Sequence, residues 1–376
     1  MKSEIHLFLI WKNAYPMLDE IAEDISKEFK IMKQIEVVWS KEKFSNNLTQ
    51  FYGTKLPPNS FKEKHCGNGP FTVLIVKDVS PKYEDRETSK GIKNVNIRMF
   101  DLKSKYRAWT GGGHKIHASN SIKETEHDLM LLFGKYIREV ENNNWGQLQN
   151  KEKIIRNIEG ATGWRNLTHL FVVLNMTVEY VILRNYEDFE KDDYKDDDID
   201  ILTNNPEELL FISRAEKIYF NKRRVAYWIR INSQKVYFDI RRIGDNYYNS
   251  NWQETFLMNR SLAKEGYFIL SNEDYFYSLL YHGLIHKHRM SEVYESRLLK
   301  LSRILKIDLP KFNSNEEIWI KILITYMKKN RYLITVPKDY SVFFNKLKVF
   351  DYKKDILTQT FRIFRTILVK LKNKIK

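Results

Sequence analysis

The sequence predicts an α+β protein with two domains and a helical carboxy-terminal extension. The chain has 376 residues, which is more than one ordinary hydrophobic core organises. Hydrophobic residues make up 43% of the chain, and with only 14 Gly and 8 Pro we expect packed elements throughout. The apolar periodicity is mixed at first and becomes purely helical from residue 272 onward, which separates the extension from the two domains.

The first domain is expected over residues 1–137, where strand and helix patterns follow each other. Residues 138–154 are polar, include three consecutive Asn, and are expected to form a linker. Within the domain, apolar runs predict strands at 5–11, 35–38 and 71–77, and helical spacing predicts helices at 17–29 and from 121 onward.

The second domain is expected over residues 155–270, as a helix followed by strands. Residues 271–376 then form the helical extension, which ends in a basic tail. The domain's elements are predicted as a helix at 166–176 and strands at 179–184, 198–203, 225–231 and 235–241.

Cysteine content and apolar runs indicate the compartment. Cys66 is the one cysteine in the sequence, so no internal disulfide forms, which is typical of a reducing environment. The first apolar stretch is short and lacks a cleavage site, so no signal peptide is expected. No apolar segment reaches the roughly 20 residues that cross a bilayer. We therefore expect a cytoplasmic protein.

The chain carries a formal charge of +15, from 63 Lys and Arg against 48 Asp and Glu. Such a surplus favours an anionic partner: a nucleotide, a nucleic acid, an anionic lipid or a phosphorylated glycan. Residues 352–376 predict a basic amphipathic helix, which either packs on the protein's own core or makes peripheral contact with the inner face of the membrane. The apolar face of this helix comprises Phe361, Phe364, Leu368, Leu371 and Ile375.

A glycine-rich loop ends in a histidine and precedes a helix. Residues 111–113 are three glycines, which let a backbone approach a ligand closely, and the Ser-Asn-Ser at 119–121 supplies helix caps and hydrogen-bond donors. One ring nitrogen of His117 could attack phosphorus while Asp128 holds the other. The alternative is a histidine that serves only the loop structure.

The segment from His117 to Asp128 resembles the active-site segment of nucleoside diphosphate kinases. The resemblance places His117 on the phosphorylated histidine, Ser119 on the serine two residues later, and Asp128 on the carboxylate that orients the imidazole. A first strand that ends at Lys12 and a Gly-Pro strand at 69–76 extend the resemblance over residues 4–136. It implies a ferredoxin-like fold and a nucleotide site with Lys12 in it.

The sequence also departs from that family. Asn13 stands where the family has proline, and Gly113 and His114 replace its Arg-Asn pair. Arg107 and Lys115 are expected to supply the cationic groups that bind phosphate, because phosphoryl transfer depends on charge neutralisation. A divergent nucleotide-binding module without kinase activity is the alternative.

Three carboxylates on predicted strands form a second group of candidate site residues. Asp198 and Asp200 are two residues apart, so both side chains point to one face of a strand. Asp239, on a later strand, could join them. Converging carboxylates suit Mg²⁺ or Mn²⁺. For the acidic run at 192–197, an exposed loop is the better interpretation.

This pattern is similar to the nucleotidyltransferase superfamily, with a short similarity to its fukutin and phosphorylcholine-transferase branch, whose members act on surface glycans. The resemblance makes Asp198 and Asp200 metal ligands and Asp239 a metal ligand or general base. The family's Gly-Ser turn is missing, and Arg184 lies near its place. Arg184 and Lys287 are expected to contact phosphate. His282 and His286 lie four apart on one helical face, but no third zinc ligand is evident.

Together these features predict a Mg²⁺-dependent nucleotidyl- or phosphotransferase. Its donor would be a nucleotide or nucleotide-activated group, and its acceptor a phosphorylated molecule or a glycan in cell-surface polysaccharide synthesis. One alternative is a nucleotidyltransferase that modifies RNA or protein, although no recognisable RNA module occurs. A second is a non-catalytic nucleotide-binding sensor or scaffold.

Overall fold

The computed structural model describes residues 3–88, 91–142, 151–186, 189, 198–221, 223–313 and 315–345. The predicted amphipathic tail at 352–376 and the acidic run at 192–197 lie outside these ranges. The chain forms two compact units, and its path runs back and forth between them. The first unit comprises residues 1–179, 205–216 and 228–236, and the second comprises 180–204, 217–227 and 237–376.

A five-stranded sheet organises the first unit, in the order β6-β1-β3-β2-β7. β3 lies antiparallel to both β1 and β2, and β1 is also antiparallel to β6, whereas β7 is parallel to β2. β1 and β3 are almost entirely buried because each lies between two neighbours. The strands are β1 (Glu4–Ile10), β2 (Lys30–Val38), β3 (Phe71–Asp78), β6 (Ile116–Ala118) and β7 (Lys151–Ile155).

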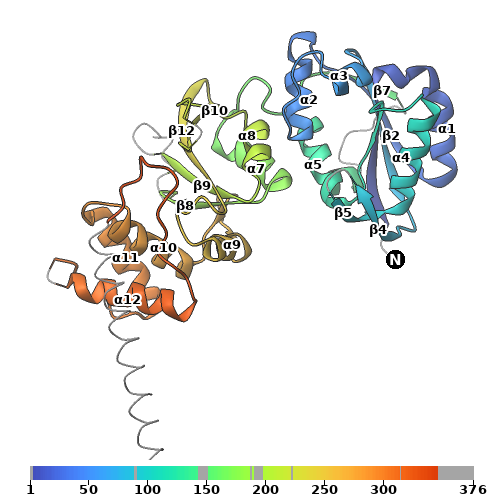
Figure 1. The fold of residues 1–376 in the computed structure, drawn as a ribbon. Helices are drawn as coiled ribbons and strands as arrows, with labels where there is room; N and C mark the ends of the chain where they lie inside the picture. Colours follow the sequence, from blue (N-terminus) through green and yellow to red (C-terminus); the bar gives the residue numbers. More distant parts are fainter. Residues whose placement is uncertain are drawn as a thin grey trace, which may run out of the picture. The chain divides into compact units, whose positions relative to one another are not determined.

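Helices α1 (Leu18–Glu28) and α4 (Ile97–Trp109) lie beside this sheet (Figure 1). They contribute Ile21, Ile25, Met99 and Tyr106 to a buried cluster that includes Phe8 of β1. The remaining elements of the unit are the hairpin β4 (Tyr83–Thr88) and β5 (Gly91–Asn96) and the helices α2 (Phe44–Tyr52), α3 (Phe61–Cys66), α5 (Ile122–Phe133), α6 (Ile137–Glu141), α7 (Leu167–Thr177) and α8 (Pro206–Ser213).

The expected linker at 138–154 contains regular structure. Its beginning overlaps α6, and its end overlaps β7, which pairs along its whole length with β2. The polar composition wrongly suggested a linker, because a strand at the edge of a sheet needs apolar residues only where it meets the core. The boundary after residue 154 also differs from the observed division, since residues 155–179 belong to the first unit.

A seven-stranded sheet has the order β10-β11-β12-β9-β8-β14-β13. β9 is parallel to β12 and antiparallel to β8, and the register places Asp200 directly beside Asp239. The strands are β8 (Tyr180–Arg184), β9 (Ile199–Thr203), β10 (Glu216–Lys217), β11 (Ala226–Ile231), β12 (Gln234–Arg242), β13 (Ser261–Leu262) and β14 (Phe268–Ile269).

Four helices complete the second unit, and three of them follow residue 271. α10 is buried almost throughout and packs against α11 and α12 in one large hydrophobic cluster. The mixed α+β class is thus confirmed. Within the described part of the chain, no helix has the length and apolar character needed to cross a membrane. The four helices are α9 (Ser250–Met258), α10 (Asn272–Ile285), α11 (Glu292–Leu305) and α12 (Glu316–Lys329).

Candidate functional site

His117 and Asp128 lie together in the first unit. His117 is on β6, opposite Leu9 of β1, and Nε2 of its ring lies 2.7 Å from Oδ2 of Asp128 on α5. Asp128 is 1% exposed and His117 is 9% exposed. A carboxylate only accepts hydrogen bonds, so Nε2 carries the proton and Nδ1 of a neutral ring presents a lone pair. The geometry therefore presents Nδ1 as a nucleophile.

A second histidine contacts the same carboxylate. Nδ1 of His127 lies 3.0 Å from Oδ1 of Asp128, so each carboxylate oxygen faces one imidazole. Burial by itself would raise the pKa of Asp128, but the two histidines outweigh it and the pKa is lowered. Conversely, burial opposes the charged form of His127, and the carboxylate still raises its pKa. Asp128 is therefore held as a carboxylate between the two rings.

Two aromatic residues at the end of α2 enclose the His117 ring. Phe51 and Tyr52 contact it edge-on, with ring centroids 5.3 Å and 5.9 Å away. The ammonium group of Lys62 lies 3.5 Å from the centre of the Tyr52 ring. Sequence reasoning missed these residues because no helix or strand was expected between the strands at 35–38 and 71–77. The available signal was the apolar spacing that ends at Gly53, which caps α2 in a left-handed conformation.

The predicted cations lie on the segments that flank this pair. Nε of Arg107 donates to the carbonyl of Ile116, the residue before His117, at 2.9 Å. Burial lowers the pKa of Arg107. The Lys115 ammonium donates to the carbonyl of Thr110. These contacts hold the loop on either side of its glycines.

Lys12 and Lys115 line the same open hollow. Its volume is about 600 Å³, and its other lining residues are Asn13, Tyr15 and Pro16. The backbone N–H of Trp11 donates to the carbonyl of Lys115 at 3.0 Å, which joins the end of β1 to the histidine loop. His117 is not among the lining residues, so the hollow supplies cationic surface and the nucleophile lies apart from its walls.

The three glycines have φ values of 79°, 82° and 82°, a left-handed conformation that favours glycine. A Cβ atom on Gly113 would lie 2.4 Å from Nδ1 of His65 on α3, and the same nitrogen accepts from the backbone N–H of His114. Gly113 therefore allows a close approach of α3, whereas the position of Gly112 is open. The close approach to a ligand that was expected of all three glycines is thus not available at Gly113, which packs against α3, and is open at Gly112.

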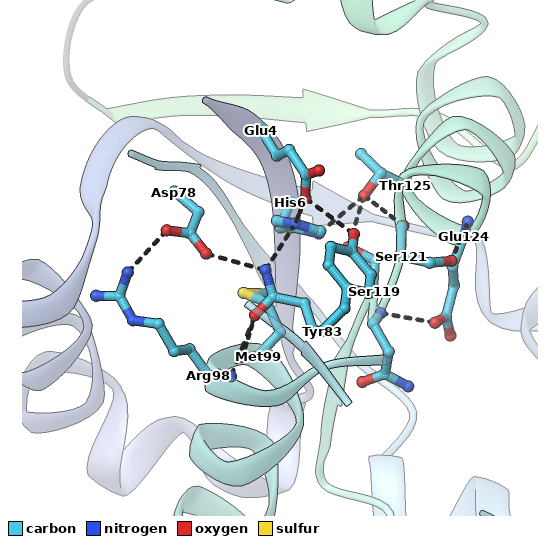
Figure 2. A network of polar contacts seen from close by, with 12 residues as sticks. Glu4, His6, Asp78, Tyr83, Arg98, Met99, Ser119, Ser121, Glu124 and Thr125 are labelled. Atoms are coloured by element: carbon cyan, nitrogen blue, oxygen red, sulfur yellow. Dashed lines mark hydrogen bonds and ion pairs between the residues drawn. The ribbon is translucent and has the colours of Figure 1, made fainter. Parts of the chain in front are cut away.

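Ser119 belongs to a buried polar network rather than to an open site. Its hydroxyl accepts from the backbone N–H of Leu7 and shares a hydrogen bond with Thr125, each at 2.9 Å. Figure 2 shows how this network continues to His6 and Glu4. Ser119 is fully buried, so its hydroxyl fastens β6 to β1 and α5. The place of Ser119 in the resemblance predicts a contact with phosphate, and in this structure its hydroxyl is engaged within the protein.

The same segment sets the start of α5 and hence the place of Asp128. The Ser121 hydroxyl accepts from the backbone N–H of Glu124 at 3.2 Å, and the Glu124 carboxylate accepts from the backbone N–H of Asn120 at 2.7 Å. Such reciprocal capping stabilises the first turn of a helix. The sequence around the predicted caps therefore fixes the register that brings Asp128 to His117.

The second unit brings Asp200 and Asp239 side by side, as expected, but each bonds to an arginine. Nη2 of Arg184 lies 2.5 Å from Oδ1 of Asp200, and Nη2 of Arg241 lies 2.9 Å from Oδ2 of Asp239. Asp198 is exposed just before β9. Burial raises the pKa of Asp200 to about 6, although Arg184 acts in the opposite direction.

These carboxylates do not form a ligand set for Mg²⁺ or Mn²⁺ as they are arranged. Among the described residues, no three His, Cys, Asp or Glu side chains are grouped so that they could hold a metal ion. Arg184, which was expected to contact phosphate, pairs with Asp200 instead. Lys287 lies exposed just beyond α10.

Comparison with known proteins finds a structural similarity over part of the chain. No family model and no curated protein matches the chain. Among the solved structures that resemble it is the nucleoside diphosphate kinase of Aquifex aeolicus, at 16% sequence identity and a TM-score of 0.24. The match covers 34% of this chain and 93% of that one.

Replacing Ser119 by Ala tests its placement in the buried network. The change leaves the N–H of Leu7 without its acceptor, so we expect the free energy of unfolding to fall by about 1–3 kcal/mol. Urea denaturation measures this loss. The matched control is Ser104→Ala, at an exposed serine that bonds within its own helix, where the change should stay within about 0.5 kcal/mol. Equal stability of the two variants would contradict the placement.

The contact between His127 and Asp128 predicts a titration that NMR can follow. The His127 ring should titrate above its ordinary pKa of about 6.5 in the wild type, and its pKa should fall in Asp128→Asn, because burial then loses the carboxylate that opposes it most. The pair accordingly stabilises the fold fully below about pH 6.5, and this contribution is lost as pH rises through the raised pKa. His114, whose pKa is lowered by burial and by nearby cations, is the control ring and should keep its midpoint in Asp128→Asn. An unchanged titration midpoint of His127 in Asp128→Asn would contradict the contact between the two residues.

Proposed function

We propose that the first unit transfers phosphoryl groups through His117, with a nucleotide as donor. The observation that carries the proposal is the hydrogen bond from Nε2 of His117 to the buried Asp128, which leaves Nδ1 with a lone pair. Nδ1 has no hydrogen bond to the described residues, and the ring is still 9% exposed. A histidine that served only structure would be expected to use both nitrogens.

In the proposed step, the lone pair of Nδ1 attacks the terminal phosphorus of a nucleoside triphosphate. A bond forms between Nδ1 and phosphorus, the bond to the bridging oxygen breaks, and the nucleoside diphosphate leaves with that electron pair. Positive charge develops on the ring, and the Asp128 carboxylate stabilises it through Nε2–H. An acceptor oxygen then takes the phosphoryl group and restores His117.

Cationic side chains support the choice of an anionic donor. Lys12 and Lys115 line the open hollow next to the histidine loop, and Arg107 holds the residue before His117. Positive groups that line a hollow lower the cost of bringing a polyphosphate to that surface. The nucleotide would arrive as its Mg²⁺ complex, which makes the ion part of the substrate.

The proposal extends to the second unit only in outline. Nucleotidyl transfer there, and a role in polysaccharide synthesis, depend on the sequence resemblances. The ion pairs of Asp200 and Asp239 with arginines favour the alternative in which this unit binds a ligand without metal-dependent catalysis. The acceptor of the phosphoryl group is accordingly proposed only as a phosphorylated molecule or a glycan.

Labelling with nucleoside triphosphates tests the phosphoryl transfer. Incubation with Mg²⁺ and a nucleotide labelled at the γ phosphate should give acid-labile label on the protein, because phosphorus bonded to an imidazole nitrogen hydrolyses in acid. A nucleotide labelled at the α phosphate should give none. His117→Gln should lose the label, and His169→Gln, a matched change at a histidine bonded to Glu159, should keep it. Label that persists in His117→Gln refutes the proposal.

A further inference from the structure

A buried polar cluster in the second unit is centred on Tyr247, which follows β12. Nη2 of Arg184 donates to the Tyr247 hydroxyl at 3.0 Å, and that hydroxyl lies 2.7 Å from Nδ1 of His282. The guanidinium of Arg241 lies 3.5 Å from the centre of the Tyr247 ring. The centre of the His286 ring lies 4.2 Å from the centre of the Tyr247 ring. Two arginines and two histidines thus surround one side chain.

The hydrogen bonds of this cluster limit its donors. Arginine only donates hydrogen bonds, so the Tyr247 oxygen accepts from Arg184. In the His282 tautomer whose Nδ1 accepts the tyrosine proton, the remaining ring proton is on Nε2. That nitrogen is buried and has no hydrogen-bond partner. In this tautomer His282 presents an unused N–H group inside the protein.

More unused groups lie around the same ring. Nη1 of Arg184, Nε of Arg241 and both ring nitrogens of His286 are also buried without a hydrogen-bond partner. One of the two His286 nitrogens carries a proton in a neutral ring, and Nε of Arg241 lies 3.7 Å from Oδ1 of Asp200. A buried donor without an acceptor costs about 1–3 kcal/mol, and such groups are rare in native proteins. Their concentration around Tyr247 indicates that an acceptor completes the cluster.

The local charge favours an anionic acceptor. Burial lowers the pKa of His282 and His286, and the charged groups that lower it further are cations, including Arg184, Arg241 and Lys287. Asp200 and Asp239 bond to the arginines and are not among the principal causes acting on the histidines. Both histidines are therefore neutral, and the principal charges that act on them are positive, which suits a ligand that only accepts hydrogen bonds.

We infer that Arg184, Arg241, His282 and His286 form a binding site for a compact oxyanion of the phosphate class. Phosphate oxygens accept hydrogen bonds and match the unused N–H groups. Each of the four residues is at most 5% exposed, which favours a single tetrahedral anion over an extended nucleotide. The site replaces the metal centre expected at the neighbouring carboxylates and is independent of the chemistry proposed for His117.

Titration calorimetry with inorganic phosphate tests the site, using the full chain in the presence of EDTA. Wild-type protein should bind phosphate, and His286→Phe should weaken this component at least about tenfold, because the ring packing remains while both nitrogens are lost. His288→Phe is the matched control, since His288 is exposed two residues later and packs on Phe343. Phosphate bound in the first unit would give a component that both variants keep.

Tyr247→Phe provides a second variant if His286→Phe fails to fold. It removes only the hydroxyl that aligns Arg184 with His282, so phosphate affinity should fall while the ring contacts stay.

Competition by ATP in EDTA distinguishes the source of the phosphate group. Displacement of bound phosphate by ATP assigns the site to a terminal phosphoryl group, and no displacement assigns it to the free anion. Phosphate binding that requires Mg²⁺, or that is absent or equal in wild type and His286→Phe, overturns the inference.

Discussion

The pairing of β1 with β6 is the constraint on which the proposed site depends. The register sets His117 opposite Leu9, and the hydroxyl of Ser119 fastens the same two strands through the N–H of Leu7. Trp11 follows the end of β1, and its N–H bonds to the carbonyl of Lys115, so one strand positions both the histidine and the cationic hollow. A shift of one residue would turn the His117 side chain to the opposite face of the sheet.

The two units treat a buried carboxylate in different ways. Asp128 is balanced by two histidines, which leave a neighbouring nitrogen available for chemistry. Asp200 is balanced by arginine, which stays charged at any physiological pH and occupies the carboxylate oxygen directly. Similar carboxylates in buried surroundings therefore hold an imidazole ring in one unit and an arginine in the other. The paired side chain makes this difference, and His117 and Arg184 each lie on another element than the carboxylate that they contact.

Sequence reasoning succeeded where the determinants lie close together in the chain. His117, the caps at Ser121 and Glu124, and Asp128 fall within one strand, turn and helix, so their meeting followed from local pattern. The burial of Ser119, the edge-on contact of Tyr52 with His117 and the pairing of Arg184 with Asp200 depend on contacts between distant segments. Such contacts leave no periodic pattern in the sequence, and β7 was not predicted for the same reason.

The first unit is built from three separate stretches of chain, and this limits how it can be made or inherited. Arg214, which comes after a stretch belonging to the second unit, donates to Gln50 and Asn47 on α2, the helix that encloses His117. A ribosome must therefore synthesise past residue 214 before α2 gains these contacts. No single break in the gene separates the two units, so duplication, loss or exchange of one would carry part of the other with it.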